Sequence, residues 1–157
     1  MANSYTKIYI QYVFAVKYRE NCITPHHNEP LQKYISGIIK NRKSQMIAIN
    51  NMPDHIHILV RQHPTYPVSK MAQEIKNNAS KMINEAGWFS HKFSWQTGYG
   101  AFSYGHAQIP KLKQYIHDQQ KHHATHTFQE EYLKLLQIFD IDFDEHYVFD
   151  FLDKTTS

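Results

Sequence analysis

The sequence has 157 residues and a mass of 18.7 kDa, with 17 basic against 14 acidic side chains. This length supports one domain with its own core, and 41% hydrophobic with 14% aromatic residues excludes a disordered chain. No apolar run approaches a membrane span, and the single cysteine, Cys22, is typical of a reducing cytoplasm. We expect one cytoplasmic domain over residues 1–157, with a core over about 5–139 and an acidic tail over 140–157.

Charge is distributed unevenly along the chain. Residues 1–128 carry 15 basic and 6 acidic side chains, a net charge of +9, whereas residues 129–157 carry 2 basic and 8 acidic ones, a net charge of −6. A basic body favours a polyanionic partner such as nucleic acid.

Hydrophobic periodicity and turn chemistry predict the elements in chain order. Alternating and β-branched segments indicate strands, while caps and a 3.6-residue apolar period indicate helices. The clearest helix begins at Val68 and ends before Gly87, a typical residue after a helix end. The predicted strands are 7–16, 45–50, 55–61 and 99–104, and the predicted helices begin at Thr24-Pro25, Val68, Pro110 and the capping box Thr127–Glu130.

The order strand, helix, strand, strand, helix, strand, helix is typical of an α+β fold. It predicts a ferredoxin-like or RNA-recognition-like sandwich, in which helices cover mainly one face of an antiparallel sheet and leave the other face open. A further helix towards the C-terminus carries Tyr115.

The segment His55-Ile56-His57 is the first candidate for chemistry. On a strand, the two histidines point to the same face, opposite Ile56 and Ile58. Two neutral imidazoles on a rigid strand suit a divalent cation. The alternative is a pair of solvent-facing histidines on a half-exposed sheet.

Tyr115 and Gln119 are the second candidate, because a spacing of four residues places them on one helix face. A tyrosine attacks a phosphodiester only when a cation polarises the phosphate, since the ordinary pKa of tyrosine is near 10. The alternative is an ordinary helix tyrosine beside Leu112 and Ile116.

Together these segments resemble the single-tyrosine transposases of the insertion-sequence 200/605 type, named HUH for histidine-hydrophobic-histidine. The resemblance spans about residues 5–139. It rests on three motifs in order: residues 51–60 around His55-Ile56-His57, residues 95–103 (WQTGYGAFS), and residues 115–123 (YIHDQQKHH).

The resemblance implies a metal-dependent enzyme that cleaves and rejoins single-stranded DNA. His55, His57 and Gln119 would hold Mg²⁺ or Mn²⁺, with Asp118 as an alternative oxygen ligand. Tyr115 would form a covalent 5′-phosphotyrosine and free a 3′-OH. The family also implies recognition of hairpins at the element's ends, and a homodimer in which the tyrosine helix serves the partner's site. The sequence is compatible with assembly of the site in cis or in trans. We expect His122 and His123 to be surface or helix-end residues near the C-terminal end of the helix dipole.

DNA binding requires cations for phosphates and aromatic rings for bases. The candidates for these contacts are Arg42, Lys43, Lys70, Lys76, Lys81, Phe93 and Trp95. The alternatives are a solvated helix face for the cations and core packing for the aromatic rings.

Two other functions are compatible with the sequence. One is a catalytically inert module that binds single-stranded nucleic acid, and the other is a domesticated relative that acts on chromosomal repeats. The complete set of His55, His57, Tyr115 and Gln119 argues against an inert remnant.

Overall fold

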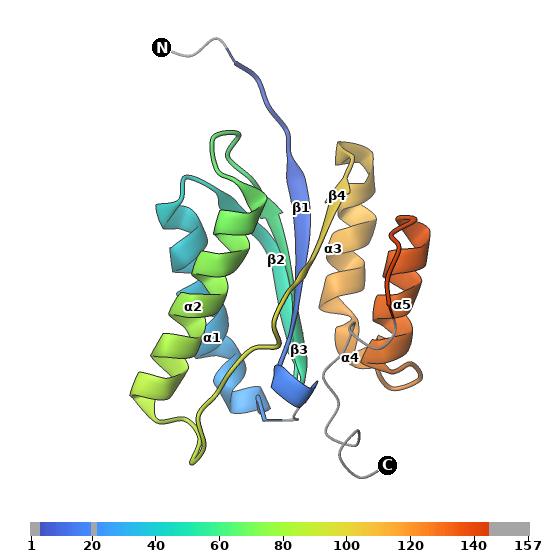
Figure 1. Cartoon of the computed structure of the whole chain (residues 1–157). Helices are drawn as coiled ribbons and strands as arrows, with labels where there is room; N and C mark the ends of the chain where they lie inside the picture. Colours follow the sequence, from blue (N-terminus) through green and yellow to red (C-terminus); the bar gives the residue numbers. More distant parts are fainter. Residues whose placement is uncertain (1–3, 20–21, 145–157) are drawn as a thin grey trace.

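The computed structural model describes residues 4–19 and 22–144 (Figure 1). Most of the expected acidic tail therefore lies outside the described residues. The elements are β1 (Tyr9–Ala15), η1 (Lys17–Arg19), α1 (Pro25–Asn41), β2 (Gln45–Met52), β3 (His55–Arg61), α2 (Val68–Ala86), β4 (Gly100–Tyr104), η2 (His106–Gln108), α3 (Ile109–His117), α4 (Gln119–His122) and α5 (Phe128–Ile138).

The four strands form one antiparallel sheet in the order β2-β3-β1-β4. The central strand β1 pairs with β3 from Tyr9 opposite Arg61 to Ala15 opposite His55. This strand order and the alternation with helices confirm the predicted α+β, ferredoxin-like fold.

One face of the sheet packs against α1 and α2 and forms the main core (Figure 1). The even-numbered residues of β1 and β3, such as Phe14 and Ile58, point to this side and are buried. Helix α2 contributes the stripe predicted from its periodicity and ends at Gly87, whose φ of 65° is left-handed. Its length and cap match the sequence-based prediction.

The other face of the sheet is covered by α3, α4 and α5 (Figure 1), whereas the sequence-based expectation was an open face. The odd-numbered residues of β1 explain the difference. Tyr9, Val13 and Ala15 are apolar and would be exposed on an open sheet. They are buried instead against Leu112 of α3 or Phe128 of α5, and this cover also encloses the polar residues of the same face.

Within residues 4–19 and 22–144, none of the helices combines the length and apolar character that a membrane span needs.

Candidate functional site

His55 and His57 lie on β3 and point to the face covered by α3–α5. Their ring centres are 5.2 Å apart, and their exposed fractions are 1% and 0%. The alternative of two solvent-facing histidines is therefore wrong. Buried polar side chains need partners, so their surroundings define the site.

Each histidine is oriented through its Nδ1 atom. For His55, Nδ1 lies 2.7 Å from Oδ1 of Asp54, in the turn just before β3. For His57, Nδ1 lies 2.8 Å from Oε1 of Gln11, whose amide nitrogen donates to Tyr104. When Nδ1 carries the hydrogen, the Nε2 atoms are left to bind a cation, as in many metal sites.

Glu131 of α5 connects the functional side chains. Its Oε1 lies 2.9 Å from Nε2 of His57, 3.2 Å from Nε2 of His123 and 3.7 Å from Nε2 of His55. Its Oε2 accepts hydrogen bonds from Gln119, at 3.0 Å, and from the hydroxyl of Tyr115. One buried carboxylate thus joins the histidine strand to the tyrosine helix.

These contacts shift the pKa values of the site. Burial alone would raise the pKa of Glu131, but hydrogen bonds with His123 and His57 outweigh it and hold the pKa well below its usual range. Burial lowers the pKa of His55, and Asp54 offsets only part of this effect. The carboxylate is therefore ionised and the His55 imidazole neutral, which are the forms that bind metal ions.

Tyr115 and Gln119 reach the same carboxylate from two short helices. Helix α3 ends at His117, and Asp118, with φ −92° and ψ 18°, separates it from α4. The single continuous helix expected over both residues is therefore interrupted. Burial and the carboxylate of Glu131 raise the pKa of Tyr115, so the phenol is neutral in this arrangement.

Asn50 of β2 anchors this interruption. Its Nδ2 donates to the carbonyl oxygens of Ile116, at 2.9 Å, and His117, at 3.2 Å. Carbonyl groups at a helix end have no partner within the helix, so Asn50 both satisfies them and fixes the end of α3 against the sheet. This contact therefore also positions Tyr115, which lies two residues before the end of α3 at His117.

His122, the last residue of α4, and His123, its C-cap, are the helix-end residues that were expected, and both also contact residues of the site. His123 contacts Glu131 and, at 3.1 Å, Oε1 of Gln119, while the ring of His122 stacks on Tyr115 with centres 4.4 Å apart. Asp118 accepts a hydrogen bond from Gln114 instead of joining the cluster.

The donor set fits a divalent cation. One ligand atom from each of His55, His57 and Glu131 lies within 4.8 Å of the others, and all three residues are buried. Nε2 of His55 is buried without a hydrogen-bond partner, which is costly unless another group binds it. Two imidazoles and a carboxylate bind several divalent metals and leave positions open for other ligands.

Four of the DNA-contact candidates are engaged in hydrogen bonds or in core packing. Arg42 donates to Glu74 at 2.7 Å. Lys76 donates to the carbonyl oxygens of Gln96 and Gly98 at 2.8 and 2.6 Å. Trp95, like Phe93, lies in the core and is only 8% exposed, so in this conformation neither ring offers a surface on which a base can stack.

Lys43 and Lys81 remain as candidates for phosphate contacts. Both are exposed, and neither forms an ion pair with a residue that the structure describes. Lys43 has a left-handed backbone, with φ 57°, just after α1. Lys70, also exposed, lies over the ring of Tyr66.

Glu131, Asn50 and Gln11 are site residues that were not expected from the sequence. Gln11 and Asn50 are polar residues within predicted apolar strands, and that pattern could have marked them as facing a polar site. Glu131 lies next to the capping residue Glu130 at the start of a helix, where an acidic residue is ordinary. No local signal distinguishes it.

A known protein family matches most of the chain. The family model described as "Transposase IS200 like" matches residues 4–119. The chain belongs to this family. No curated protein matches the sequence at a significant level. The matched segment ends before α5 and therefore does not include Glu131.

Two solved structures have the same fold as this IS200-like transposase. One is a protein of Deinococcus radiodurans R1 provisionally described as a transposase, with 18% identity and a TM-score of 0.61, covering 76% of this chain and 95% of that chain. The other is a REP-associated tyrosine transposase bound to a REP hairpin, with 16% identity and a TM-score of 0.58, covering 78% of this chain and 73% of that chain.

Proposed function

We propose that the protein is a metal-dependent transposase that cleaves and rejoins single-stranded DNA through a covalent bond to Tyr115. The observation that carries this proposal is the convergence of Tyr115 and both imidazoles of the His55-Ile56-His57 motif on one buried carboxylate, Glu131. This arrangement combines a nucleophile with a cation site, as attack on a phosphodiester requires.

His55, His57 and Glu131 would hold the cation, with Gln119 as the further ligand that the family resemblance implies. The ion is Mg²⁺ or Mn²⁺, a choice that rests on the family and the reaction, since imidazole ligands also suit zinc or nickel. When bound, it would act as a Lewis acid towards a phosphate oxygen. A cation is also needed because Glu131 would otherwise repel an anionic phosphate beside Tyr115.

The chain's own residues account for the geometry of the nucleophile. Glu131 accepts the hydrogen bond of Tyr115, Asn50 fixes the end of α3, and His122 stacks on the phenol ring. In the reaction, a bond forms between the tyrosine oxygen and phosphorus while the bond from phosphorus to O3′ breaks. The phenol loses its proton and the departing O3′ gains one, so the step is balanced and can be reversed by a new 3′-OH.

Single-stranded DNA with hairpins at the element's ends is the proposed substrate. The basic body of the chain and the similarity to a transposase bound to a REP hairpin support this choice. A homodimer remains a prediction from the family resemblance. The contacts of Tyr115 with His57 and Glu131 within one chain support a site assembled inside a single protomer.

Covalent trapping tests the proposal. The protein is incubated with Mg²⁺ or Mn²⁺ and single-stranded oligonucleotides from the sequences that flank its gene, and adducts are resolved on a denaturing gel. We expect an adduct with the wild type and none with Tyr115→Phe or after metal chelation. Tyr99→Phe, at a tyrosine that is 41% exposed, is the matched control and retains the adduct. An adduct that persists in Tyr115→Phe would disprove this nucleophile.

Two other outcomes separate the rival functions. Salt-dependent DNA binding with no adduct under any metal would indicate an inert binding module. Adduct formation with chromosomal repeats, but not with the sequences that flank the gene, would indicate a domesticated relative with the same chemistry.

A further inference from the structure

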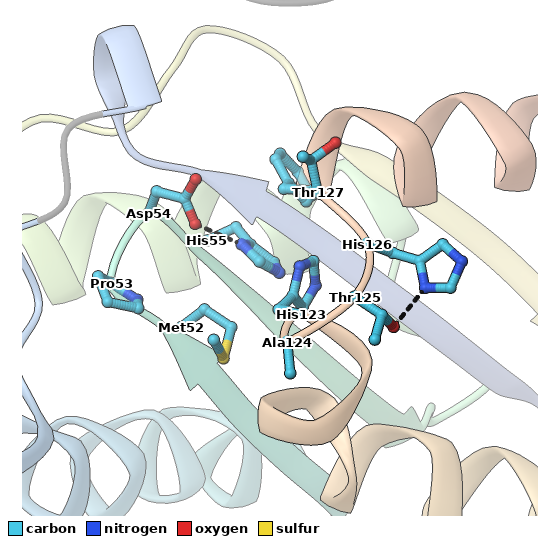
Figure 2. Close-up of a pocket in the computed structure, with 10 residues that line it drawn as sticks. Met52, Pro53, Asp54, His55, His123, Ala124, Thr125, His126 and Thr127 are labelled. Atoms are coloured by element: carbon cyan, nitrogen blue, oxygen red, sulfur yellow. Dashed lines mark hydrogen bonds and ion pairs between the residues drawn. The ribbon is translucent and has the colours of Figure 1, made fainter.

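A hollow with a basic lining lies at the end of β3 farthest from His55. It has a volume of about 220 Å³ and is lined by Lys43, Arg61, His63 and neighbouring, mostly polar residues. None of the described residues that line it is acidic. The hollow beside His55, in contrast, contains the carboxylate of Asp54, which contacts the histidine ring (Figure 2). The Lys43–Arg61 hollow is therefore the one whose charge suits an anion.

The two cations of the Lys43–Arg61 hollow have no partner for their charges. Neither side chain forms a hydrogen bond or an ion pair with a residue that the structure describes. Arg42, which precedes Lys43, instead donates to Glu74 at 2.7 Å. Like charges that line one hollow repel each other, so an anion bound between them would lower their electrostatic energy.

The backbone of Lys43 has an unusual conformation. Lys43 follows the C-cap of α1 with φ 57°, a left-handed conformation in which glycine or asparagine is usual. The hydroxyl of Ser44 fixes this turn against the end of β3, because it donates to the carbonyl oxygen of Arg42 at 3.1 Å and accepts from the backbone N–H of His63 at 2.9 Å. A strained residue at an exposed turn indicates a role other than folding, and its unpaired ammonium group provides one.

Arg61 lies on the same side of the sheet as the histidine motif. Side chains alternate along a strand, so Arg61 points to the same face as His55 and His57. Arg61 lies four residues after His57, which corresponds to about 13 Å along the strand. A phosphate in the hollow is therefore distinct from one at the His57 site, yet close enough to belong to the same DNA strand.

An exposed aromatic ring beside the hollow favours a nucleic acid over a free phosphate ion. Thr6 lines the hollow, and the preceding residue, Tyr5, is 96% exposed. Sites for single-stranded nucleic acid combine cations that contact the backbone with aromatic rings on which bases stack.

We propose that the hollow lined by Lys43, Arg61 and His63 binds one backbone phosphate of single-stranded DNA, away from the scissile phosphate, and that Tyr5 stacks on a neighbouring base. The inference deepens the proposed function and rests on it, because it takes single-stranded DNA as the substrate. The guanidinium group of Arg61 and the ammonium group of Lys43 hold the phosphate together, so removal of either one releases it.

Salt-dependent binding without cleavage tests the site. The affinity for a single-stranded oligothymidylate is measured over a range of salt concentrations with a metal chelator present, so that no strand is cleaved. The variants are Lys43→Asn and Arg61→Gln, alone and together. Lys33→Gln, at a 76% exposed position on α1 that pairs with Glu29, is the matched control.

We expect each single variant to lower the slope of log affinity against log salt concentration by about 0.7, and the double variant to lower it by no more, because the two cations share one phosphate. Lys43→Asn combined with Lys81→Gln should lower it by about 1.4, since Lys81 on α2 would contact a different phosphate. Lys33→Gln should leave the slope unchanged. Tyr5→Ala should weaken binding at least about fivefold without changing the slope.

Stability separates this role from a structural one. Asparagine adopts the left-handed conformation more readily than lysine, so Lys43→Asn should raise the melting temperature while it weakens DNA binding. If Arg61→Gln does not fold, Gln45→Glu replaces it in the test. Gln45 is exposed and lies opposite Arg61 in the sheet, so the introduced carboxylate would pair with the guanidinium group and exclude the phosphate.

Unchanged slopes in the single variants, or a double variant that lowers the slope by about 1.4, would overturn the proposal. Wild-type protein that does not bind the oligonucleotide would also overturn it. A normal covalent adduct with unchanged slopes would disprove this site alone, whereas the expected slopes with no adduct would disprove the proposed catalytic function alone.

Discussion

Glu131 is the residue on which the geometry of the site depends. It is 8% exposed and contacts three histidines, a glutamine and the proposed nucleophile. Burying such a carboxylate is costly unless other groups bind it. In this structure imidazole rings, an amide and a phenol hydroxyl bind it. The same atoms are suitable ligands for a divalent cation.

Replacement of Glu131 by glutamine should weaken cation binding. Glu131→Gln keeps the shape and one oxygen but removes the negative charge, so we expect the dissociation constant for Mn²⁺, measured by calorimetry, to rise at least about tenfold. Glu85→Gln, at an exposed carboxylate on α2, should leave it unchanged. Equal Mn²⁺ affinity in Glu131→Gln would mean that the histidines and Gln119 suffice.

The sequence predicts the local part of this site and not the part that depends on packing. His55, His57 and Tyr115 can be found because each lies in a short motif whose element fixes its direction. Glu131 could not be found, since its role arises only when α5 packs on the second face of the sheet. The fold could be predicted because it follows from local signals, namely the succession of strands and helices along the chain and the periodicity of each helix.

Helix α5 is the element that closes the site, and its packing leaves no room beside β4. A Cβ atom on Gly100 would lie 2.7 Å from the hydroxyl oxygen of Tyr132 and 3.0 Å from the ring of Phe102. Both distances are too short for ordinary contacts. The absence of a side chain at Gly100 therefore allows α5 to approach the sheet.

Gly100→Ala should destabilise the protein by about 1–3 kcal/mol, the usual cost of overpacking a core, as measured by urea unfolding. Gly37→Ala is the matched control, because a Cβ there meets nothing within 4 Å in the middle of α1. It should stabilise the protein by about 0.5–1 kcal/mol. A neutral or stabilising Gly100→Ala would show that α5 packs less closely than described.

At the scale of the whole molecule, the net charge of +3 conceals a basic body of +9 over residues 1–128. Four of the cations expected to contact DNA fall into two groups. Arg42 and Lys76 serve internal contacts with Glu74 and with backbone carbonyls, whereas Lys43 and Lys81 face solvent. Only the second group is available for phosphates without breaking a contact.

This division predicts different effects on DNA binding. Lys43→Ala and Lys81→Ala should each reduce the slope of log affinity against log salt concentration for single-stranded DNA by about 0.7. Arg42→Ala should leave the slope unchanged and lower the melting temperature instead, because it removes the contact with Glu74. A reduced slope in Arg42→Ala with unchanged stability would reverse this assignment.

The proposed function depends on covalent attachment of Tyr115 to a cleaved DNA strand at a site held by His55, His57 and Glu131. Mass spectrometry of the digested adduct, formed with Mn²⁺ and single-stranded DNA from the sequences that flank the gene, tests it most directly. We predict a single modified peptide in which the oxygen of Tyr115 carries the 5′-phosphate of the downstream strand. A modified residue other than Tyr115, or a 3′-phosphate linkage, would contradict the proposed mechanism.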